Sequence, residues 1–243
     1  MGTKNTKKLQ IMAFAWSVGL FGRLAVLILQ GLGLVRVEGI RNLRVLLAQN
    51  EGFLLIHRHP SMREIVIIPL LFVPWALWNW KKVPVVTPDK HNFYDPWWCA
   101  PLRPLAIPVL RENHNAMSTA AFKMRRALLE GKPLILAPEG GRTFNGTMFK
   151  YLLPCGCIRV AGSPEGGVDL SQPIIRRFRE RVGDLCGNGK KGVLIPVLPV
   201  WVESHKWHTT IIFGKPTILP PNTLDKTEAL EYLLLRTSRQ RSR

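Results

Sequence analysis

The sequence has few cysteines, and their spacing excludes the usual cysteine-built sites. Cys99, Cys155, Cys157 and Cys186 do not form the Cys-x-x-Cys pairs that are typical of zinc ligands. We therefore expect no metal site. The thiols are expected to be reduced and to have structural roles, since no disulfide framework is evident.

Acidic residues are also scarce, with 16 Asp and Glu against 34 Lys and Arg, so the formal charge is +18. Such an excess predicts an anionic partner: nucleic acid, an anionic membrane, a phosphorylated substrate or an acidic carrier protein. The basic residues are dispersed and form no recognisable reading module, and the aromatic residues lie within apolar runs. We therefore expect an anionic phospholipid membrane as a partner and no nucleic acid.

No low-complexity linker and no internal repeat divides the chain, whose 243 residues are enough for one substantial core. The N-terminus differs from the rest, because residues 9–35 form an apolar run behind Lys4, Lys7 and Lys8. A signal peptide fits poorly, since no small-residue cleavage site follows the run. We predict a membrane-associating helical segment over residues 1–36 and one domain over residues 37–243.

The apolar run is long enough to cross a bilayer, which takes roughly 20 residues. Arg23 lies near its middle, however, and a central Arg costs about 2.5 to 3.5 kcal/mol on insertion scales. Two half-helices hinged near Gly19 and Gly22 would keep Arg23 among the head groups. We therefore expect interfacial anchoring rather than spanning, at the cytoplasmic face; a helix packed on its own domain is the alternative.

Short apolar runs alternate with longer helical patterns in the remaining sequence. The expected strands cover residues 52–56, 83–87, 106–110, 133–137, 193–201 and 209–213. The expected helices cover residues 65–80, where Pro69 and Pro74 interrupt the run, and residues 116–130 and 226–236. This alternation predicts an α/β domain with a mostly parallel or mixed central sheet flanked by helices.

The first of these strands leads into His57-Arg58-His59-Pro60-Ser61-Met62-Arg63-Glu64. Five helical steps leave two positions roughly 140° apart, so His59 can face Glu64 only if it precedes the helix. Glu64 would then hold one ring nitrogen and leave the other as a general base for a hydroxyl. His57 has Met62, which is not an acid, five residues later, so His59 is the histidine with an acid at this spacing. A capping box between Ser61 and Glu64, beside a structural histidine, is the alternative interpretation.

A second candidate site follows the strand at residues 133–137. Its turn carries Gly140 and Gly141, whose backbone N–H groups can approach an anion, and Arg142, which can bind one. Arg111, directly after the run at residues 106–110, has a similar character. An ordinary Gly-Gly turn and a solvated strand-end charge are the alternatives.

Four short blocks, each modest alone, occur in a specific order. They are His59-Pro60-Ser61-x-x-Glu64, Ile107-Pro108-Val109-x-Arg111, Leu134-Ile135-Leu136-x-Pro138-Glu139-Gly140-x-Arg142 and Ile195-Pro196-Val197. In this order they resemble the blocks of the glycerolphosphate acyltransferase family, and most closely the 1-acylglycerol-3-phosphate acyltransferases. The resemblance covers about residues 37–217.

The resemblance implies transfer of a fatty acyl group from acyl-CoA or acyl-carrier protein to the hydroxyl of lysophosphatidate, with no bound cofactor. It assigns His59 as the base and Glu64 as its partner. It assigns the acceptor phosphate to Arg111, Glu139, Gly140, Gly141 and Arg142, and the acyl or donor side to Ile195, Pro196 and Val197. The absence of a nucleophile elbow favours direct attack by the substrate hydroxyl over an acyl-enzyme.

Several positions depart from the family pattern. Glu64 stands where the family usually has Asp, Leu105 where it usually has Gly, and Gly141 where it usually has Thr, and the segment at residues 162–191 is longer than usual. These departures leave other acceptors open: glycerol 3-phosphate, another lysophospholipid, an alcohol or an amine. A basic protein that only binds membrane or nucleic acid is the alternative outside the enzymes.

Overall fold

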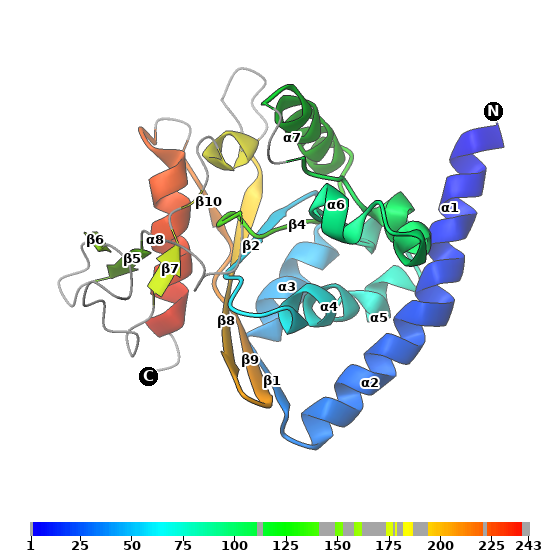
Figure 1. The fold of residues 1–243 in the computed structure, drawn as a ribbon, viewed down its shortest axis with the longest axis horizontal. Coiled ribbons are helices and arrows are strands. Elements are labelled where there is room, and N and C mark those ends of the chain that lie inside the picture. The colour runs from blue at the N-terminus through cyan, green and yellow to red at the C-terminus, as the bar shows by residue number, and fades with distance from the viewer. Residues whose placement is uncertain are drawn as a thin grey trace.

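The core of the fold is a mixed sheet with strand order β1-β9-β8-β2-β4-β3, in which β10 also pairs with β8 (Figure 1). The computed structural model describes residues 2–110, 114–140, 149–152, 158–161, 174–176, 178, 182–186, 194–220 and 223–239. Helices flank the sheet on both faces. The α/β class predicted from the alternating pattern is therefore confirmed.

The strands of the central sheet run in two directions. They are β1 (Val35–Glu38), β2 (Leu54–His57), β3 (Val85–Val86), β4 (Leu134–Leu136), β8 (Pro196–His205), β9 (His208–Phe213) and β10 (Thr217–Ile218). β2 is parallel to β4 and β8, and β4 is parallel to β3, whereas β9 is antiparallel to β8. The carboxyl ends of β2, β3, β4 and β8 therefore lie at one edge of the sheet.

Successive side chains of β2 point to opposite faces, as the pleat requires. Leu54 and Ile56 pack in one core cluster with α7 (His114–Leu129), η6 (Val182–Cys186) and α8 (Lys226–Ser238). Phe53 and Leu55 pack in the other cluster with α3 (Ile40–Ala48) and α4 (Arg63–Leu70). Shorter helices complete the described fold: α5 (Val73–Ala76), η2 (Trp80–Lys82), α6 (Lys90–Phe93) and η3 (Trp97–Leu105).

The strand expected over residues 106–110 is wrong. Two isolated bridges, Val86↔Ala106 and Asp89↔Val109, take its place. Pro108 lies between them and has no N–H to donate, so it interrupts a continuous ladder. The long apolar run at residues 65–80 divides between α4 and α5, as its prolines predicted.

A second, antiparallel sheet lies against α8 and was not predicted. It consists of β5 (Phe149–Leu152), β6 (Ile158–Ala161) and β7 (Ile174–Arg176), in the order β6-β5-β7. Glu231 of α8 is buried and forms an ion pair with Lys150 of β5, and its other oxygen accepts the Phe178 N–H at 2.8 Å. The carboxylate thus fastens this small sheet to the helix.

The N-terminal segment is one continuous helix along the side of the domain (Figure 1). It consists of α1 (Gly2–Phe14), the π-helical η1 (Ala15–Gly19) and α2 (Leu20–Gly31), so the hinge expected near Gly19 and Gly22 is wrong. A Cβ on Gly22 would lie 2.6 Å from Leu70 Cδ2 of α4. The absence of a side chain therefore allows close helix packing at this point and does not mark a bend.

The helix has two distinct faces. A narrow stripe that includes Ile11, Ala15 and Val26 is buried against the domain. The opposite face is broad and exposes large apolar side chains: Val18, Leu20, Phe21, Leu24, Leu27, Ile28 and Leu32. Leu9–Gly31 is long and apolar enough to cross a membrane, and only 22% of the apolar window is buried in the protein. This helix could therefore anchor the chain to a membrane.

Candidate active site

His59 and Glu64 meet at the carboxyl edge of the sheet, as the sequence predicted. β2 ends at His57, His59 lies in the following turn, and Glu64 is in the first turn of α4. His59 Nδ1 and Glu64 Oε1 are 2.7 Å apart, and Glu64 is fully buried. The longer Glu side chain therefore reaches the imidazole without difficulty.

The same carboxylate also holds Ser61. Glu64 Oε1 accepts the Ser61 N–H at 3.1 Å, and Glu64 Oε2 accepts the Ser61 hydroxyl at 2.6 Å. The helix begins at Arg63 with Met62 as its N-cap, one residue later than a cap at Ser61 would require. Glu64 thus makes the backward bond of a capping box and the bond to His59 together. The His59–Glu64 pair and the Ser61–Glu64 contact, which the sequence offered as alternatives, therefore occur together.

The charge of Glu64 determines which nitrogen of His59 carries the proton. Burial alone would raise the pKa of Glu64, but hydrogen bonds from His59 and Ser61 outweigh it and hold that pKa below its ordinary value. Glu64 is therefore ionised at neutral pH and only accepts hydrogen bonds. Nδ1 of His59 must carry the proton, and Nε2 is left with a free lone pair.

Glu139 is the second buried carboxylate of this edge, and its two oxygens accept backbone N–H groups. Oε1 accepts from His59 at 3.1 Å, and Oε2 accepts from Arg176 of β7 at 2.9 Å. The side chain is only 2% exposed. Glu139 therefore holds the backbone of the turn that carries His59 and joins it to the small sheet, a role that the sequence did not indicate.

Arg58 and His57 line the interior side of the turn. Arg58 Nη1 donates to the Val202 carbonyl at 3.2 Å, and its guanidinium carbon lies 4.7 Å from the centre of the Trp201 ring. Burial lowers the pKa of Arg58, while the carboxylates of Glu139, Glu203 and Glu64 act to raise it. The guanidinium remains charged, so a buried cation balances the buried carboxylates.

His57 is buried and neutral. Its Nδ1 lies 2.9 Å from the Arg58 carbonyl oxygen, which can only accept, so Nδ1 is the protonated nitrogen. Burial is the main cause that lowers its pKa from 6.5 to about 4. His57 therefore supports the turn as a hydrogen-bond donor, in agreement with the choice of His59 as the base.

The predicted phosphate residues are described only in part. Gly140 follows Glu139 in a turn after β4, where its φ of +68° favours glycine and its N–H donates to the Ala137 carbonyl at 3.3 Å. Arg111, Gly141 and Arg142 lie outside the described residues. Their assignment to an acceptor phosphate stays a prediction.

Ile195, Pro196 and Val197 lie far from the dyad along the sheet. All three are buried, and Val197 pairs with Leu54 at the start of β2. The similar triplet Leu198-Pro199-Val200 is the one that reaches the site edge, since Pro199 pairs with Ile56 and Val200 with His57. A role of Ile195–Val197 on the acyl side stays a prediction, whereas their observed place is the core.

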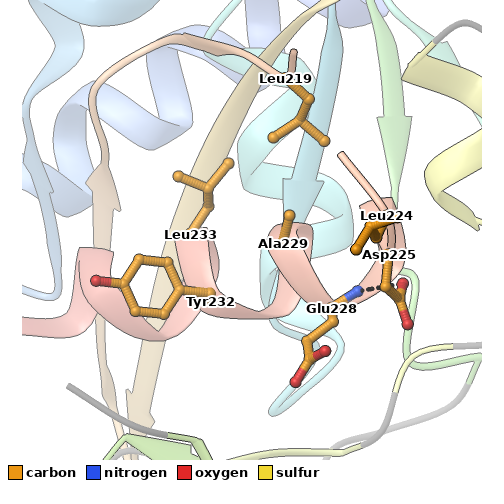
Figure 2. A pocket seen from close by; sticks show the side chains of 7 residues that line it. All are labelled: Leu219, Leu224, Asp225, Glu228, Ala229, Tyr232 and Leu233. Atoms are coloured by element: carbon orange, nitrogen blue, oxygen red, sulfur yellow. Dashed lines mark hydrogen bonds between the residues drawn. The ribbon is translucent and has the colours of Figure 1, made fainter. Parts of the chain in front are cut away.

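Other candidate sites lie apart from this edge. Among the described residues, no group of three His, Cys, Asp or Glu side chains could hold a metal ion. Cys99 and Cys186 are free and buried, and burial raises the pKa of Cys186 to about 12. A cavity of about 490 Å³ on α8 contains none of the described site residues (Figure 2). It is lined by Leu219, Leu224, Asp225, Glu228, Ala229, Tyr232 and Leu233.

A comparison with models of protein families identifies the family of this chain. The model of a family described as Acyltransferase matches residues 34–203, well over half of the chain. The chain belongs to the acyltransferase family. The matched region contains His59, Glu64 and Glu139 and leaves the N-terminal helix outside. A search of curated proteins found no match for this acyltransferase.

The role of Glu139 can be tested with Glu139→Gln. The amide turns an N–H group towards one of the two backbone N–H donors, so the turn that carries His59 should shift. Because misplacement of a catalytic group by about 1 Å can cost 10²-fold, we expect kcat of acyl transfer to fall by roughly that factor. Steady-state kinetics with circular dichroism would measure this.

Glu130→Gln is the matched control, because Glu130 is partly exposed and pairs with Arg126 and Lys132 on the surface. Its kcat should stay near the wild-type value. Unchanged kcat in folded Glu139→Gln would show that the carboxylate does not position His59.

Acid should destabilise the protein through His57. The folded pKa of about 4 lies below the ordinary value of 6.5, so the unfolded chain binds the proton first. The stabilising contribution is complete above pH 6.5 and is lost as the pH falls towards 4. It amounts to roughly 3 kcal/mol over this window. Glu64 adds a loss in the same direction below its ordinary pKa of 4.5.

The measurement is urea unfolding of the wild type and His57→Gln at several pH values between about 7 and 4.5. Glutamine can still donate to the Arg58 carbonyl but does not titrate, so the free energy of unfolding should depend less on pH. An equal pH dependence in the two proteins would contradict the assignment of a neutral, buried His57.

Proposed function

We propose that this acyltransferase transfers a fatty acyl group from acyl-CoA or acyl-carrier protein to the free hydroxyl of lysophosphatidate, which gives phosphatidate. The observation that carries the proposal is the His59–Glu64 dyad at the carboxyl edge of the sheet, within a chain of the acyltransferase family. The ordered blocks of the sequence support the choice of acceptor.

The proposed reaction is a direct attack. Nε2 of His59 takes the proton of the acceptor hydroxyl while its oxygen bonds to the thioester carbonyl carbon. Glu64 stabilises the imidazolium through the bond to Nδ1. The tetrahedral intermediate then collapses, the C–S bond breaks, and the imidazolium returns the proton to the leaving thiolate. The products are an ester and a free thiol. We assign the acceptor phosphate to the turn after β4 and to Arg111.

We also propose that the N-terminal helix lies in the plane of the membrane. The domain packs along it from Ile11 to Val26, about 22 Å of helix at 1.5 Å per residue. A helix crossing a hydrocarbon core of about 30 Å would therefore draw the domain into the bilayer. In the plane, the exposed apolar face meets lipid, while Arg23, whose Nη1 is buried, lies on the domain side.

A panel of acceptors and donors tests the proposed function. Purified protein in vesicles would receive lysophosphatidate, glycerol 3-phosphate or another lysophospholipid, each with acyl-CoA and with acyl-carrier protein. We expect the highest kcat/KM with lysophosphatidate. Absence of turnover with lysophosphatidate, beside turnover with another acceptor, would retain the chemistry and reject this substrate.

His59→Ala removes the proposed base. Since general base catalysis contributes typically 10²- to 10⁴-fold, we expect turnover to fall by roughly that factor while vesicle binding and the circular dichroism spectrum stay unchanged. His91→Ala is the control, because His91 is an exposed imidazole on α6 that belongs neither to the dyad nor to the β8–β9 hairpin. Retained turnover in His59→Ala would remove His59 as the base.

A further inference from the structure

The hairpin between β8 and β9 projects from the edge of the sheet that carries the dyad (Figure 1). β2 ends opposite Val200, but β8 continues to His205. At about 3.3 Å per residue, the hairpin tip lies roughly 16 Å further along the strand direction. Its residues His205, Lys206, Trp207 and His208 are all exposed. The tip therefore extends beyond the site into the surroundings.

Trp207 is the large side chain of this tip, and it is 75% exposed. Single exposed apolar residues are common on proteins, so exposure alone has no special meaning. An indole next to cations is, however, the usual composition of a surface at the level of lipid head groups. Lys206 and Arg63 are both exposed cations at this tip.

The tip lies next to the end of the N-terminal helix. β1 pairs in parallel with β9 so that Val35 is opposite Thr209, and the Thr209 N–H donates to the Leu34 carbonyl at 2.9 Å. This register places Trp207 beside the junction between α2 and β1, where Leu32 is 66% exposed. The lipid-facing side of the helix therefore continues onto the hairpin tip.

The tip is also bonded to the loop that carries the dyad. The Arg63 guanidinium donates to the Lys206 carbonyl, and Arg63 directly precedes Glu64. β8 also contacts the loop at Arg58. The Arg58 N–H donates to the carbonyl of Val200, and the Arg58 guanidinium donates to the carbonyl of Val202. The tip is therefore joined by a hydrogen bond to the residue that directly precedes Glu64.

We propose that the β8–β9 tip is a second membrane contact, in which Trp207 enters the boundary between head groups and acyl chains of an anionic bilayer. Lys206 and Arg63 meet the lipid phosphates, in line with the basic charge of the chain. Together with the N-terminal helix, the tip holds the dyad edge towards the bilayer. This inference rests on the proposed function, because the acceptor and its acyl chain reside in that bilayer.

The test is flotation of the full chain with vesicles of phosphatidylcholine and phosphatidylglycerol in equal parts. Loss of the exposed indole in Trp207→Ala should weaken partitioning by roughly tenfold, from the apolar area that an indole contributes. Phe122→Ala is the matched control, since Phe122 is 70% exposed on α7, on the other face of the sheet. Unchanged partitioning of Trp207→Ala, or an equal loss in Phe122→Ala, would overturn the proposal.

A second variant keeps the proposal testable if Trp207→Ala does not fold. Trp207→Phe retains an aromatic ring at the tip. Subtracting the fluorescence emission of this variant from that of the wild type gives the emission of Trp207 alone. When the protein binds vesicles that contain lipids brominated near the head group, the bromine atoms should quench this Trp207 emission. No quenching of it would also reject the contact.

Neither measurement needs turnover. A chain that binds vesicles through Trp207 but transfers no acyl group would therefore refute only the proposed function. A chain that is active on lysophosphatidate but binds without Trp207 would refute only the hairpin contact.

Discussion

The parallel pairing of β2 with β4 is the constraint on which the site depends. Leu54, Leu55 and Ile56 pair with Leu134, Ile135 and Leu136, so both strands end at the same level. The turn after β2 carries His59 and the turn after β4 carries Glu139, and this register brings the Glu139 carboxylate to the His59 N–H. Glu139, in the turn after β4, thus holds His59 by its backbone, and Glu64 of α4 holds it by its ring.

Buried charge is the second constraint at this edge. Glu64 and Glu139 are both almost fully buried, and an unpaired buried carboxylate would cost several kcal/mol. Hydrogen bonds to each carboxylate, and the Arg58 guanidinium over Trp201, offset that cost. The carboxylate of Glu64 remains ionised for the same reason, and its charge fixes the tautomer of His59. The geometry of the His59–Glu64 pair and the stability of this edge therefore have a common origin.

The sequence predicted the dyad because its signal is local. His59 follows an apolar strand and has an acid five residues later, which is sufficient once the helix is known to begin after His59. The resemblance to the family assigned Glu139 to the acceptor phosphate, because the sequence block that contains it matches the family pattern. The sequence does not show which groups Glu139 contacts in the fold. Its partners, His59 and Arg176, come from other elements, and only the fold brings them together. A buried acid after a strand was the only available signal.

Other parts of the sequence were difficult to interpret because one local pattern has two tertiary meanings. Pro-Val occurs twice in β8, and only strand register shows that Pro199-Val200 is the pair at the site edge. Gly22 was taken for a hinge, but the missing side chain serves helix packing against Leu70. The small sheet of β5, β6 and β7 had no clear periodicity, since its strands are short and depend on Glu231 of α8 for support.

Membrane geometry and the dyad are linked by the order of the elements along the chain. The N-terminal helix leads through Leu32 into β1, β1 pairs with β9, and β9 forms the hairpin whose tip is bonded to Arg63 beside Glu64. Each step is a backbone pairing or a side-chain hydrogen bond, so a continuous series of contacts joins the helix to the dyad. In the proposed orientation, with the helix in the plane of the bilayer, this series of contacts also determines the height of His59 relative to the lipid surface. For the proposed acceptor, whose acyl chain would stay in the lipid, that height decides whether the hydroxyl reaches His59.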